Sequence, residues 1–435
     1  MQFSILVLLV ILLDISLTHA GEFVCELQST AQLMKITNSS SCAVFKQQYL
    51  VPFDPNTSYW HTPPMKELQQ RLHYKIEREE ALRIGVLGGS VSLSWINGSA
   101  PLASTLQRLL DYPSIEVYNG AMGGTGAIVP AGCLSAILGD IILDIVILEF
   151  AINDIFEKNL RALVDHLQHR FNDDITIILL SVTSRLMKSK HPTNLAKGLS
   201  MNRSVATRYG LILIDWSSVA DKGYGITYRP DEIWHDKNKQ HPMRVGQDWI
   251  QYCVASSIQE IYSHRDPSIT AAAHRPSTIE LQQDTLCLSS FMCDVFGAHV
   301  HRFEQYSHMG KCWKMVVKDY MKTCIKLTYA DDFNPECIDG SDHTISFAVQ
   351  VTQPCQLYFT VVGNHVGGKQ NSVCTLEVHV NERFIFNATG YNQYVTQTPY
   401  ELLPEPLAVG TYNVSVMGRG TSESPICSIG SIICV

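Results

Sequence analysis

The sequence predicts an α/β domain built on a parallel β-sheet, followed by a disulfide-bearing, all-β sandwich-like domain. Two observations predict this order. Between residues 81 and 262, short apolar runs alternate with stretches that have helical spacing, which is typical of an α/β layer structure. From residue 285 onward, strand-like segments separated by turn residues take over, and nine of the thirteen cysteines occur there.

The first domain is expected to contain five buried parallel strands. Such strands are covered on both faces and therefore consist of short, nearly continuous apolar runs. The runs are 82–87, 115–118, 144–148, 175–180 and 211–214. The spacing of apolar residues predicts helices between them, for example over 102–110, 160–171 and 195–209. Strands of the second domain are predicted at 347–351, 357–362, 376–380 and 412–416.

Changes in composition divide the chain into five segments. Residues 1–20 are interpreted as a signal peptide, because an apolar run is followed by small residues suited to signal peptidase. This run is shorter than the roughly 20 apolar residues that span a bilayer, so no integral membrane segment is expected after signal removal. The other predicted segments are an N-terminal approach segment (21–80), the α/β domain (81–262), a linker (263–284) and the Cys-rich β domain (285–435).

Composition and cysteine content favour export and argue against nucleic-acid binding. The 435 residues include 33 Lys and Arg and 41 Asp and Glu, and the net charge of −8 disfavours a nucleic-acid partner. Thirteen cysteines without a Cys-x-x-Cys pair are more typical of disulfides in an oxidising compartment than of zinc or thioredoxin-like sites, and the odd number leaves at least one free or paired with another chain. The chain is therefore expected to be a glycoprotein that is secreted or resides in the lumen of the secretory pathway. Six Asn-x-Ser/Thr sequons support this: Asn38, Asn56, Asn97, Asn202, Asn387 and Asn413.

Four segments place polar residues or glycines where predicted strands end or where the last helix begins. Ser90 follows the first strand, Gly124 lies in a glycine-rich stretch after the second, and Asn153 follows the third. His241 lies just before the last helical stretch. Because the carboxyl ends of parallel strands form the ligand-binding edge of open α/β sheets, we expect these four residues to converge. A serine on a sharp turn, a histidine and donors for an oxyanion are the components of acyl transfer.

Each of these motifs also has an ordinary structural explanation. Ser90 and Asn153 are residue types that cap helices, and glycine-rich turns often lead into helices. His235 and His241 are candidate metal ligands, but no ligand set such as His-Glu-x-x-His accompanies them. A phosphate-binding loop is disfavoured because the lysine of that motif is absent from the glycine-rich stretch. No metal and no other cofactor is expected.

The order and placement of these residues resemble the SGNH (GDSL-like) hydrolase superfamily, whose four blocks supply Ser, Gly, Asn and His. The resemblance covers residues 82–262 and implies a flavodoxin-like, three-layer α/β/α domain that hydrolyses carboxylic esters. The resemblance also implies the roles of the individual residues. Ser90 would be the nucleophile, His241 the general base, and Ser90, Gly124 and Asn153 the donors of the oxyanion hole.

The sequence departs from the family pattern at two positions. The acid that usually precedes the nucleophile is Gly89 here, which is similar to some carbohydrate-directed members. The position three residues before His241, where the family's acid normally stands, is Asn238. Asp236 is the predicted third catalytic residue, Asp231 is the alternative, and a Ser-His dyad is also open.

The resemblance and the export signal together predict a secreted serine esterase. Its expected substrates are acyl esters, acetyl esters first among them, on a carbohydrate or glycoconjugate, and the reaction would pass through an acyl-enzyme. A lipid esterase or an acyltransferase on the same fold is the enzymatic alternative. A catalytically inactive secreted binding protein is the alternative from another class. The expected partner is therefore an acylated carbohydrate, glycoconjugate or lipid.

Overall fold

The structure is a computed structural model, and it places part of the chain. The described residues are 50–51, 62–93, 102–222, 241–242, 244–263, 286–289, 306–309, 313–318, 324–329, 343–362, 375–389, 397–401, 403, 405–419 and 427–435. The expected signal peptide (1–20), residues 264–284 of the expected linker and the first three sequons lie outside the described residues.

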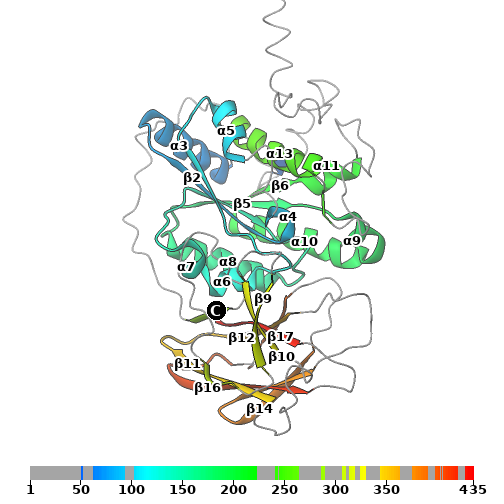
Figure 1. The fold of residues 1–435 in the computed structure, drawn as a ribbon. Helices are drawn as coiled ribbons and strands as arrows, with labels where there is room; N and C mark the ends of the chain where they lie inside the picture. The colour runs from blue at the N-terminus through cyan, green and yellow to red at the C-terminus, as the bar shows by residue number, and fades with distance from the viewer. Residues whose placement is uncertain are drawn as a thin grey trace, which may run out of the picture.

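The first domain is built on a six-stranded sheet with the order β1-β6-β5-β4-β2-β3 (Figure 1). The five strands other than β1 are parallel to their neighbours, which confirms the predicted α/β fold with a parallel sheet. A short edge strand, β1, pairs antiparallel with β6. The strands are β1 (Leu50–Val51), β2 (Leu82–Gly88), β3 (Ile115–Asn119), β4 (Ile145–Glu149), β5 (Thr176–Ser181) and β6 (Ile212–Asp215).

Helices cover both faces of this sheet, as the alternation of side chains along the strands requires. In β4, Ile145 and Ile147 join one buried cluster, whereas Val146 and Leu148 join the other. The first cluster includes residues of α3 (Pro63–Glu77), α5 (Leu102–Leu110) and α13 (Arg244–Ser263). The second includes residues of α6 (Ile128–Gly132), α7 (Leu134–Leu138), α8 (Glu157–Arg170) and α10 (Pro192–Tyr209). The remaining helices, α4 (Ser90–Leu93), α9 (Arg185–Lys190) and α11 (Trp216–Lys222), follow the carboxyl ends of β2, β5 and β6.

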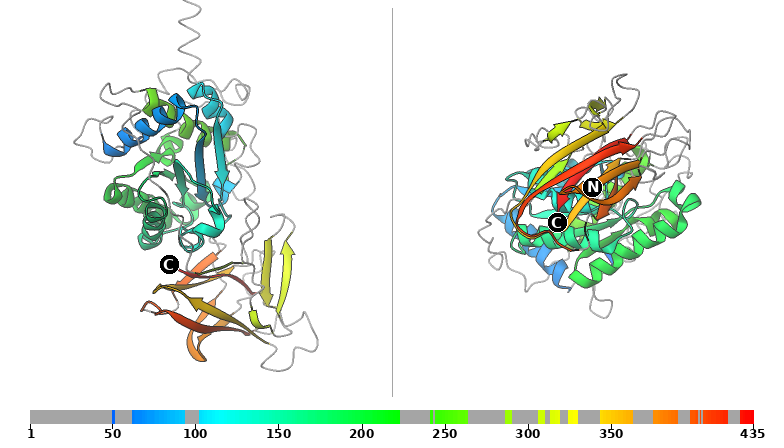
Figure 2. Two further views of the ribbon diagram at one scale, coloured as in Figure 1. Left: turned by 90° about the vertical axis from the view of Figure 1, so that its left-hand side faces the viewer. Right: turned by 90° about the horizontal axis from the view of Figure 1, so that it is seen from below.

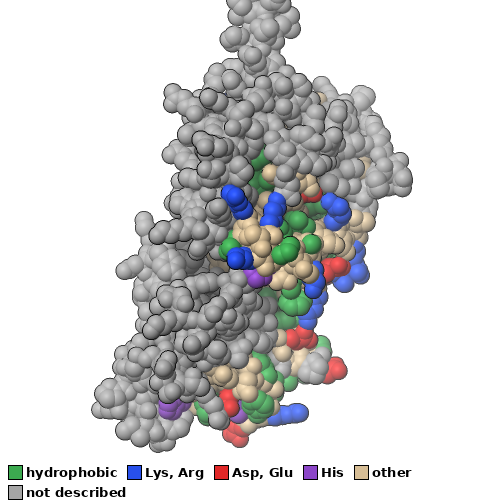
Figure 3. All heavy atoms as spheres, turned by 90° about the vertical axis from the view of Figure 1, so that its right-hand side faces the viewer, with side chains coloured by type: hydrophobic (Ala, Val, Ile, Leu, Met, Phe, Trp, Pro, Cys, Tyr) green, Lys and Arg blue, Asp and Glu red, His purple; other side chains and the backbone are tan. Residues whose placement is uncertain are grey.

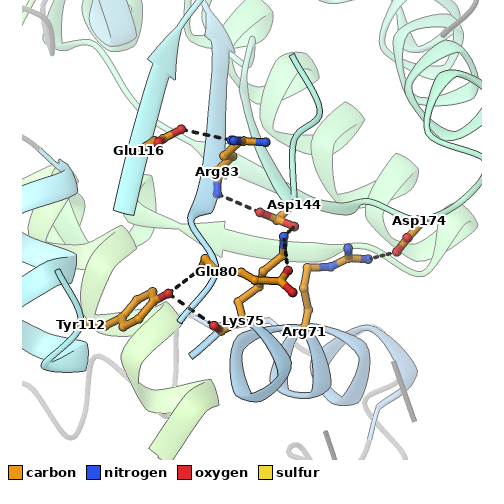
Figure 4. A network of polar contacts seen from close by, with 8 residues as sticks. All are labelled: Arg71, Lys75, Glu80, Arg83, Tyr112, Glu116, Asp144 and Asp174. Carbon is orange, nitrogen blue, oxygen red and sulfur yellow. Dashed lines mark hydrogen bonds and ion pairs between the residues drawn. The ribbon is translucent and has the colours of Figure 1, made fainter. Parts of the chain in front are cut away.

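A polar network fixes α3 against the amino-terminal edge of the sheet (Figure 4). The Asp144 carboxylate accepts a hydrogen bond from the Arg83 backbone N–H at 2.8 Å and lies 3.2 Å from the Lys75 ammonium group. The Arg71 guanidinium group is 2.7 Å from Asp174. Asp144 is only 5 % exposed, and a buried charge is costly unless it is paired and hydrogen-bonded; Lys75 and the Arg83 N–H supply these partners. This network anchors the strands at the edge opposite to the ends that carry Ser90 and Asn153.

The second domain is a sandwich of two antiparallel sheets, which confirms the predicted all-β domain. One sheet has the order β15-β12-β17-β10-β9, with β7 paired to β17, and the other has the order β14-β13-β16-β11-β8. Apolar side chains from both sheets form one core, among them Phe347 of β11 and Phe359 of β12. The strands are β7 (Leu286–Ser289), β8 (Tyr306–Met309), β9 (Trp313–Lys318), β10 (Cys324–Tyr329), β11 (Thr344–Val351), β12 (Leu357–Val362), β13 (Thr375–Val380), β14 (Arg383–Thr389), β15 (Gln397–Glu401), β16 (Gly410–Arg419) and β17 (Cys427–Cys434).

The sandwich packs against the α6–α8 side of the first domain (Figure 2). Ile433 of β17 is fully buried and belongs to the same apolar cluster as α6 and α8. A Cβ atom placed on Gly132 of α6 would lie 2.9 Å from the Ile433 Cβ, so the two backbones approach closely. Lys158 of α8 forms an ion pair with Glu401 of β15 and lies 5.8 Å from the centre of the Tyr358 ring.

The described cysteines and sequons refine the expectations about export. Cys355 and Cys434 form a disulfide within the second domain, and Cys253 is a buried free thiol. Asn202 is 1 % exposed, and its amide group donates to the Leu180 carbonyl and lies within hydrogen-bonding distance of Ser181. The folded chain therefore cannot present Asn202 to a glycosyltransferase. Asn387 and Asn413, in contrast, are exposed.

Candidate active site

Ser90 follows the carboxyl end of strand β2, and its hydroxyl group meets a histidine from the far end of the domain. β2 lies between β3 and β4 and ends at Gly88, and Ser90 is the first residue of α4. The Ser90 Oγ and the His241 Nε2 are 2.8 Å apart, although 151 positions separate the two residues in sequence. His241 precedes α13, which packs with α3 and α5 on one face of the sheet. This distance lets an unprotonated Nε2 accept the serine proton.

Asn153 lies directly beside the residue that precedes the serine. It follows β4 in a turn whose backbone N–H groups, at Asn153 and Asp154, donate to the Phe150 carbonyl at 3.0 and 2.9 Å. A Cβ atom on Gly89 would lie 1.6 Å from the Asn153 amide nitrogen. No side chain at position 89 fits this arrangement, so the glycine there has a steric reason. Asn153 is 8 % exposed and presents an amide donor beside Ser90.

Gly124 reaches the same sheet edge by continuing the pairing of β2 with β3. The N–H groups of Gly120 and Met122 donate to the carbonyls of Val86 and Gly88, both at 2.8 Å. Gly124 is two residues beyond Met122, as Ser90 is two beyond Gly88. Its φ angle of +68° lies in the left-handed region that favours glycine. The two residues therefore turn away from adjacent strands at the same level of the sheet.

Asp154 connects the Asn153 turn to the Gly124 loop. Its carboxylate accepts hydrogen bonds from the backbone N–H groups of Phe156 at 2.9 Å and Ala127 at 3.0 Å. Burial raises the pKa of Asp154 to about 6, although these N–H donors act in the opposite direction. At neutral pH the carboxylate is ionised and holds both backbone segments together.

Glu149 is a buried acid behind the serine turn that sequence analysis did not single out. Its carboxyl group accepts from the Gly89 N–H at 3.3 Å and from the Ser92 hydroxyl at 3.1 Å. The residue is fully buried, and burial raises the pKa of Glu149 to about 8, so this acid is mostly protonated at neutral pH. The signal in the sequence is an acidic residue that ends an otherwise apolar strand, but pattern alone does not separate it from an exposed strand end.

The structure thus brings four of the predicted site residues to one edge of the sheet. Ser90 and His241 are in hydrogen-bonding contact, Asn153 lies against the serine turn, and Gly124 leaves the neighbouring strand at the same level. The predicted acid Asp236, its alternative Asp231 and the position of Asn238 lie outside the described residues. Among the residues that the structure describes, no group of three or more His, Cys, Asp or Glu side chains is arranged to hold a metal ion.

Comparison with solved structures identifies the fold. No protein-family model matches the sequence, and no curated protein matches it either. A two-domain esterase (CEX) described as active on acetylated mannans is similar over 84 % of this chain and 95 % of its own, with a TM-score of 0.52 and 15 % identity. A structure of that esterase co-crystallised with mannopentaose covers 86 % of this chain and 94 % of its own, with a TM-score of 0.54 and 14 % identity. The chain therefore has an SGNH (GDSL-like) hydrolase fold, as the resemblance of its four motifs predicted. The similarity extends over both domains, since it covers more than four-fifths of the chain.

Proposed function

We propose that this protein is a serine esterase that removes acyl groups, acetyl groups first among them, from a carbohydrate or glycoconjugate. The observation that carries the proposal is the 2.8 Å contact between the Ser90 hydroxyl and the His241 Nε2. It lies at the carboxyl edge of a parallel sheet, where this class of fold binds ligands. A merely helix-capping serine does not require an imidazole at this distance.

The reaction begins when the Ser90 oxygen attacks the ester carbonyl carbon and passes its proton to His241. The oxyanion that forms accepts hydrogen bonds from the N–H groups of Ser90 and Gly124 and from the Asn153 amide. Each such donor contributes roughly 2.7–4 kcal/mol of transition-state stabilisation. As the intermediate collapses, the leaving alcohol takes the proton from His241. A water molecule then attacks the acyl-enzyme and passes a proton to His241. When this second intermediate collapses, the carboxylic acid leaves and His241 returns the proton to the Ser90 oxygen.

The carbohydrate assignment rests on three features of the chain. Gly89 replaces the acid that usually precedes the nucleophile, and in this respect the chain is similar to carbohydrate-directed members of the superfamily. A β-sandwich is appended to the α/β domain and packs on it through Ile433. The two-domain esterase described as active on acetylated mannans is similar over 84 % of this chain and 95 % of its own.

The third catalytic residue and the location in the cell complete the proposal. Asp236 is proposed to orient the His241 ring and to stabilise its protonated form. Secretion is proposed from the apolar N-terminal segment and the cysteine content, and the disulfide between Cys355 and Cys434 supports it. Among the described helices, none has the length and apolar character needed to cross a membrane.

Hydrolysis of p-nitrophenyl acetate by the purified full chain tests the catalytic proposal. We expect the wild type to release p-nitrophenol well above background and Ser90→Ala and His241→Ala to lose at least about a thousandfold in kcat/KM. A panel of acetylated glycans and acyl lipids then separates the carbohydrate esterase from a lipid esterase. Equal rates for the wild type and Ser90→Ala would refute catalysis and favour a binding protein. Asp236→Ala and Asp231→Ala, measured side by side, identify the acid.

A further inference from the structure

One stretch of this acidic chain carries only positive charges. Residues 175–214 contain six Lys and Arg and no Asp or Glu, although acidic residues outnumber basic ones in the whole chain by 41 to 33. The first four of these cations lie on α9 and on the first turns of α10. We call them the basic shoulder, and they are Arg185, Lys188, Lys190 and Lys197.

The basic shoulder lies beside the candidate active site because of the register of two neighbouring strands. Leu148 of β4 pairs with Leu179 of β5, and five residues beyond each lie Asn153 and Ser184. The Ser184 side chain caps α9 by accepting from the Met187 N–H at 3.4 Å. The basic residues therefore begin just beyond the carboxyl end of β5, beside the end of β4 that Asn153 follows.

Helix α10 contacts the Asn153 turn itself. A Cβ atom on Gly198 would lie 1.9 Å from the Ala151 carbonyl oxygen and 3.0 Å from that of Asp154. The helix backbone therefore packs directly on the turn, and Lys197 is the adjacent residue. This contact fixes the basic shoulder relative to Ser90 rather than leaving it on an independent segment.

Two of the four cations of the basic shoulder are open to solvent. Lys190 and Lys197 are exposed, and Arg185 and Lys188 are half-buried. Figure 3 shows the side of the molecule on which α9 and α10 lie, where Lys and Arg side chains gather over the described part of the surface.

Building on the proposed esterase function, we propose that the basic shoulder binds an anionic polysaccharide whose sugars carry carboxylates, and that the acyl group removed at Ser90 is borne by such a chain. The Cβ atoms of residues three apart on a helix, as Arg185 and Lys188 are, lie about 5–6 Å apart, which is comparable to the length of one pyranose in a chain. A uronate carboxylate is attached directly to the ring, so its spacing follows the sugar repeat and can match such a row of cations. The positive field also steers the polymer toward the site.

Two observations separate this ligand from other polyanions. Membrane surfaces are bound by basic helices that also expose large apolar side chains. The exposed large apolar side chains of the described residues are Ile142, Phe156, Phe384 and Val409, and none belongs to the basic shoulder. Phe156 is 52 % exposed and lies three residues beyond Asn153, where its ring offers an apolar face to a sugar.

Binding of polygalacturonate to the Ser90→Ala full chain tests the inference without turnover. Isothermal calorimetry at low and high salt compares polygalacturonate with neutral dextran. We expect binding to polygalacturonate alone, weakened by salt as exposed charge pairs are. The triple variant Arg185→Ser, Lys190→Ser, Lys197→Ser should bind about tenfold more weakly, because each exposed contact contributes little by itself. The matched control is Arg78→Ser, Arg108→Ser, Arg383→Ser, which removes three exposed cations elsewhere and should retain wild-type affinity.

The outcomes distinguish this inference from the proposed function. Equal binding to dextran, tighter binding to sulfated dextran, anionic phospholipid vesicles or RNA, or undiminished binding by the shoulder variant would each overturn the carboxylate assignment. Circular dichroism melting of both triple variants excludes misfolding as the cause of a lost affinity. Absence of wild-type activity on p-nitrophenyl acetate would instead refute the esterase, and it is measured independently of polysaccharide binding.

Discussion

Replacing Gly89 by alanine adds a single methyl group at the centre of the candidate active site. The new Cβ would lie 1.6 Å from the Asn153 amide nitrogen, where ordinary van der Waals contact begins at 3.4 Å. The amide must therefore move by about 2 Å, which takes it out of hydrogen-bonding reach of an oxyanion held near Ser90. The φ angle of Gly89 is not in the left-handed region, so alanine fits the backbone itself and the effect falls on Asn153.

The expected loss for Gly89→Ala is that of one oxyanion donor. Such a loss lowers kcat by about 10²–10³, or roughly 2.7–4 kcal/mol, with a much smaller change in KM. The assay is steady-state hydrolysis of p-nitrophenyl acetate, with the melting temperature recorded for each variant. Gly410→Ala is the matched control, because the atoms nearest to a Cβ there belong to the Tyr412 side chain and begin at an ordinary distance of 3.6 Å.

A double-mutant cycle shows whether the loss acts through Asn153. Asn153→Ala removes the amide that Gly89→Ala displaces, so the double variant should be no slower than Asn153→Ala alone. Two results would refute the reasoning. One is a Gly89→Ala enzyme within about fivefold of the wild type, and the other is a double variant whose loss is the product of the two single losses.

Three further predictions concern stability. The pKa of Glu149 is about 8 in the folded chain and about 4.5 in the unfolded chain, so between these pH values the folded chain holds a proton that the unfolded chain has lost. The contribution of Glu149 to the free energy of unfolding is therefore complete below pH 4.5 and is lost as the pH rises toward 8. Urea unfolding should therefore show that, between pH 5.5 and 7.5, the free energy of unfolding of the wild type falls by about 1–3 kcal/mol relative to that of Glu149→Gln. An equal change in the free energy of unfolding of both proteins would contradict this assignment. Asp144→Ala should cost about 1–3 kcal/mol, because it leaves the Arg83 N–H without its partner, while kcat on p-nitrophenyl acetate stays at the wild-type value; a large loss of kcat would show that the network reaches the site. Ile433→Ala should cost about 2–4 kcal/mol in thermal unfolding, and an unchanged melting temperature would mean that the two domains do not stabilise each other.

The sheet of the first domain could be predicted because its strands are buried on both faces. A strand such as 145–149 is an almost unbroken apolar run, and the structure places β4 within one residue of the predicted range 144–148. The edge strand β1 could not be predicted, because two residues are too few to carry a pattern. Asn202 shows the limit of local motifs. Its sequon is intact, but α10 turns that face inward and buries the amide against β5.

The convergence of Ser90, Gly124 and Asn153 was predictable from the order of the strands, whereas the groups that support them were not. Parallel strands bring all carboxyl ends to one edge, so the positions after β2, β3 and β4 are neighbours whatever the loops do. The roles of Glu149 and Asp154 depend on burial and on the direction of their carboxyl groups. Neither burial nor the direction of a carboxyl group can be read from a sequence pattern, because an acidic residue at the end of a strand is equally common at solvent-exposed positions.

In the proposed mechanism, Gly89 and Glu149 together take the place of the acid that precedes the nucleophile in the superfamily that the four motifs resemble. A side chain at position 89 would occupy the space that the Asn153 amide fills. The carboxyl group at this turn comes instead from Glu149, on the neighbouring strand, and it accepts the Gly89 N–H from behind the sheet edge. Protonated at neutral pH, Glu149 supports the backbone before Ser90 without placing a negative charge beside a developing oxyanion. An acid restored at position 89 would displace Asn153 and add that charge, so we expect Gly89→Asp to be slower than Gly89→Ala in the same p-nitrophenyl acetate assay. A Gly89→Asp enzyme as fast as the wild type would show that the exchange of acids between the two strands has no catalytic consequence.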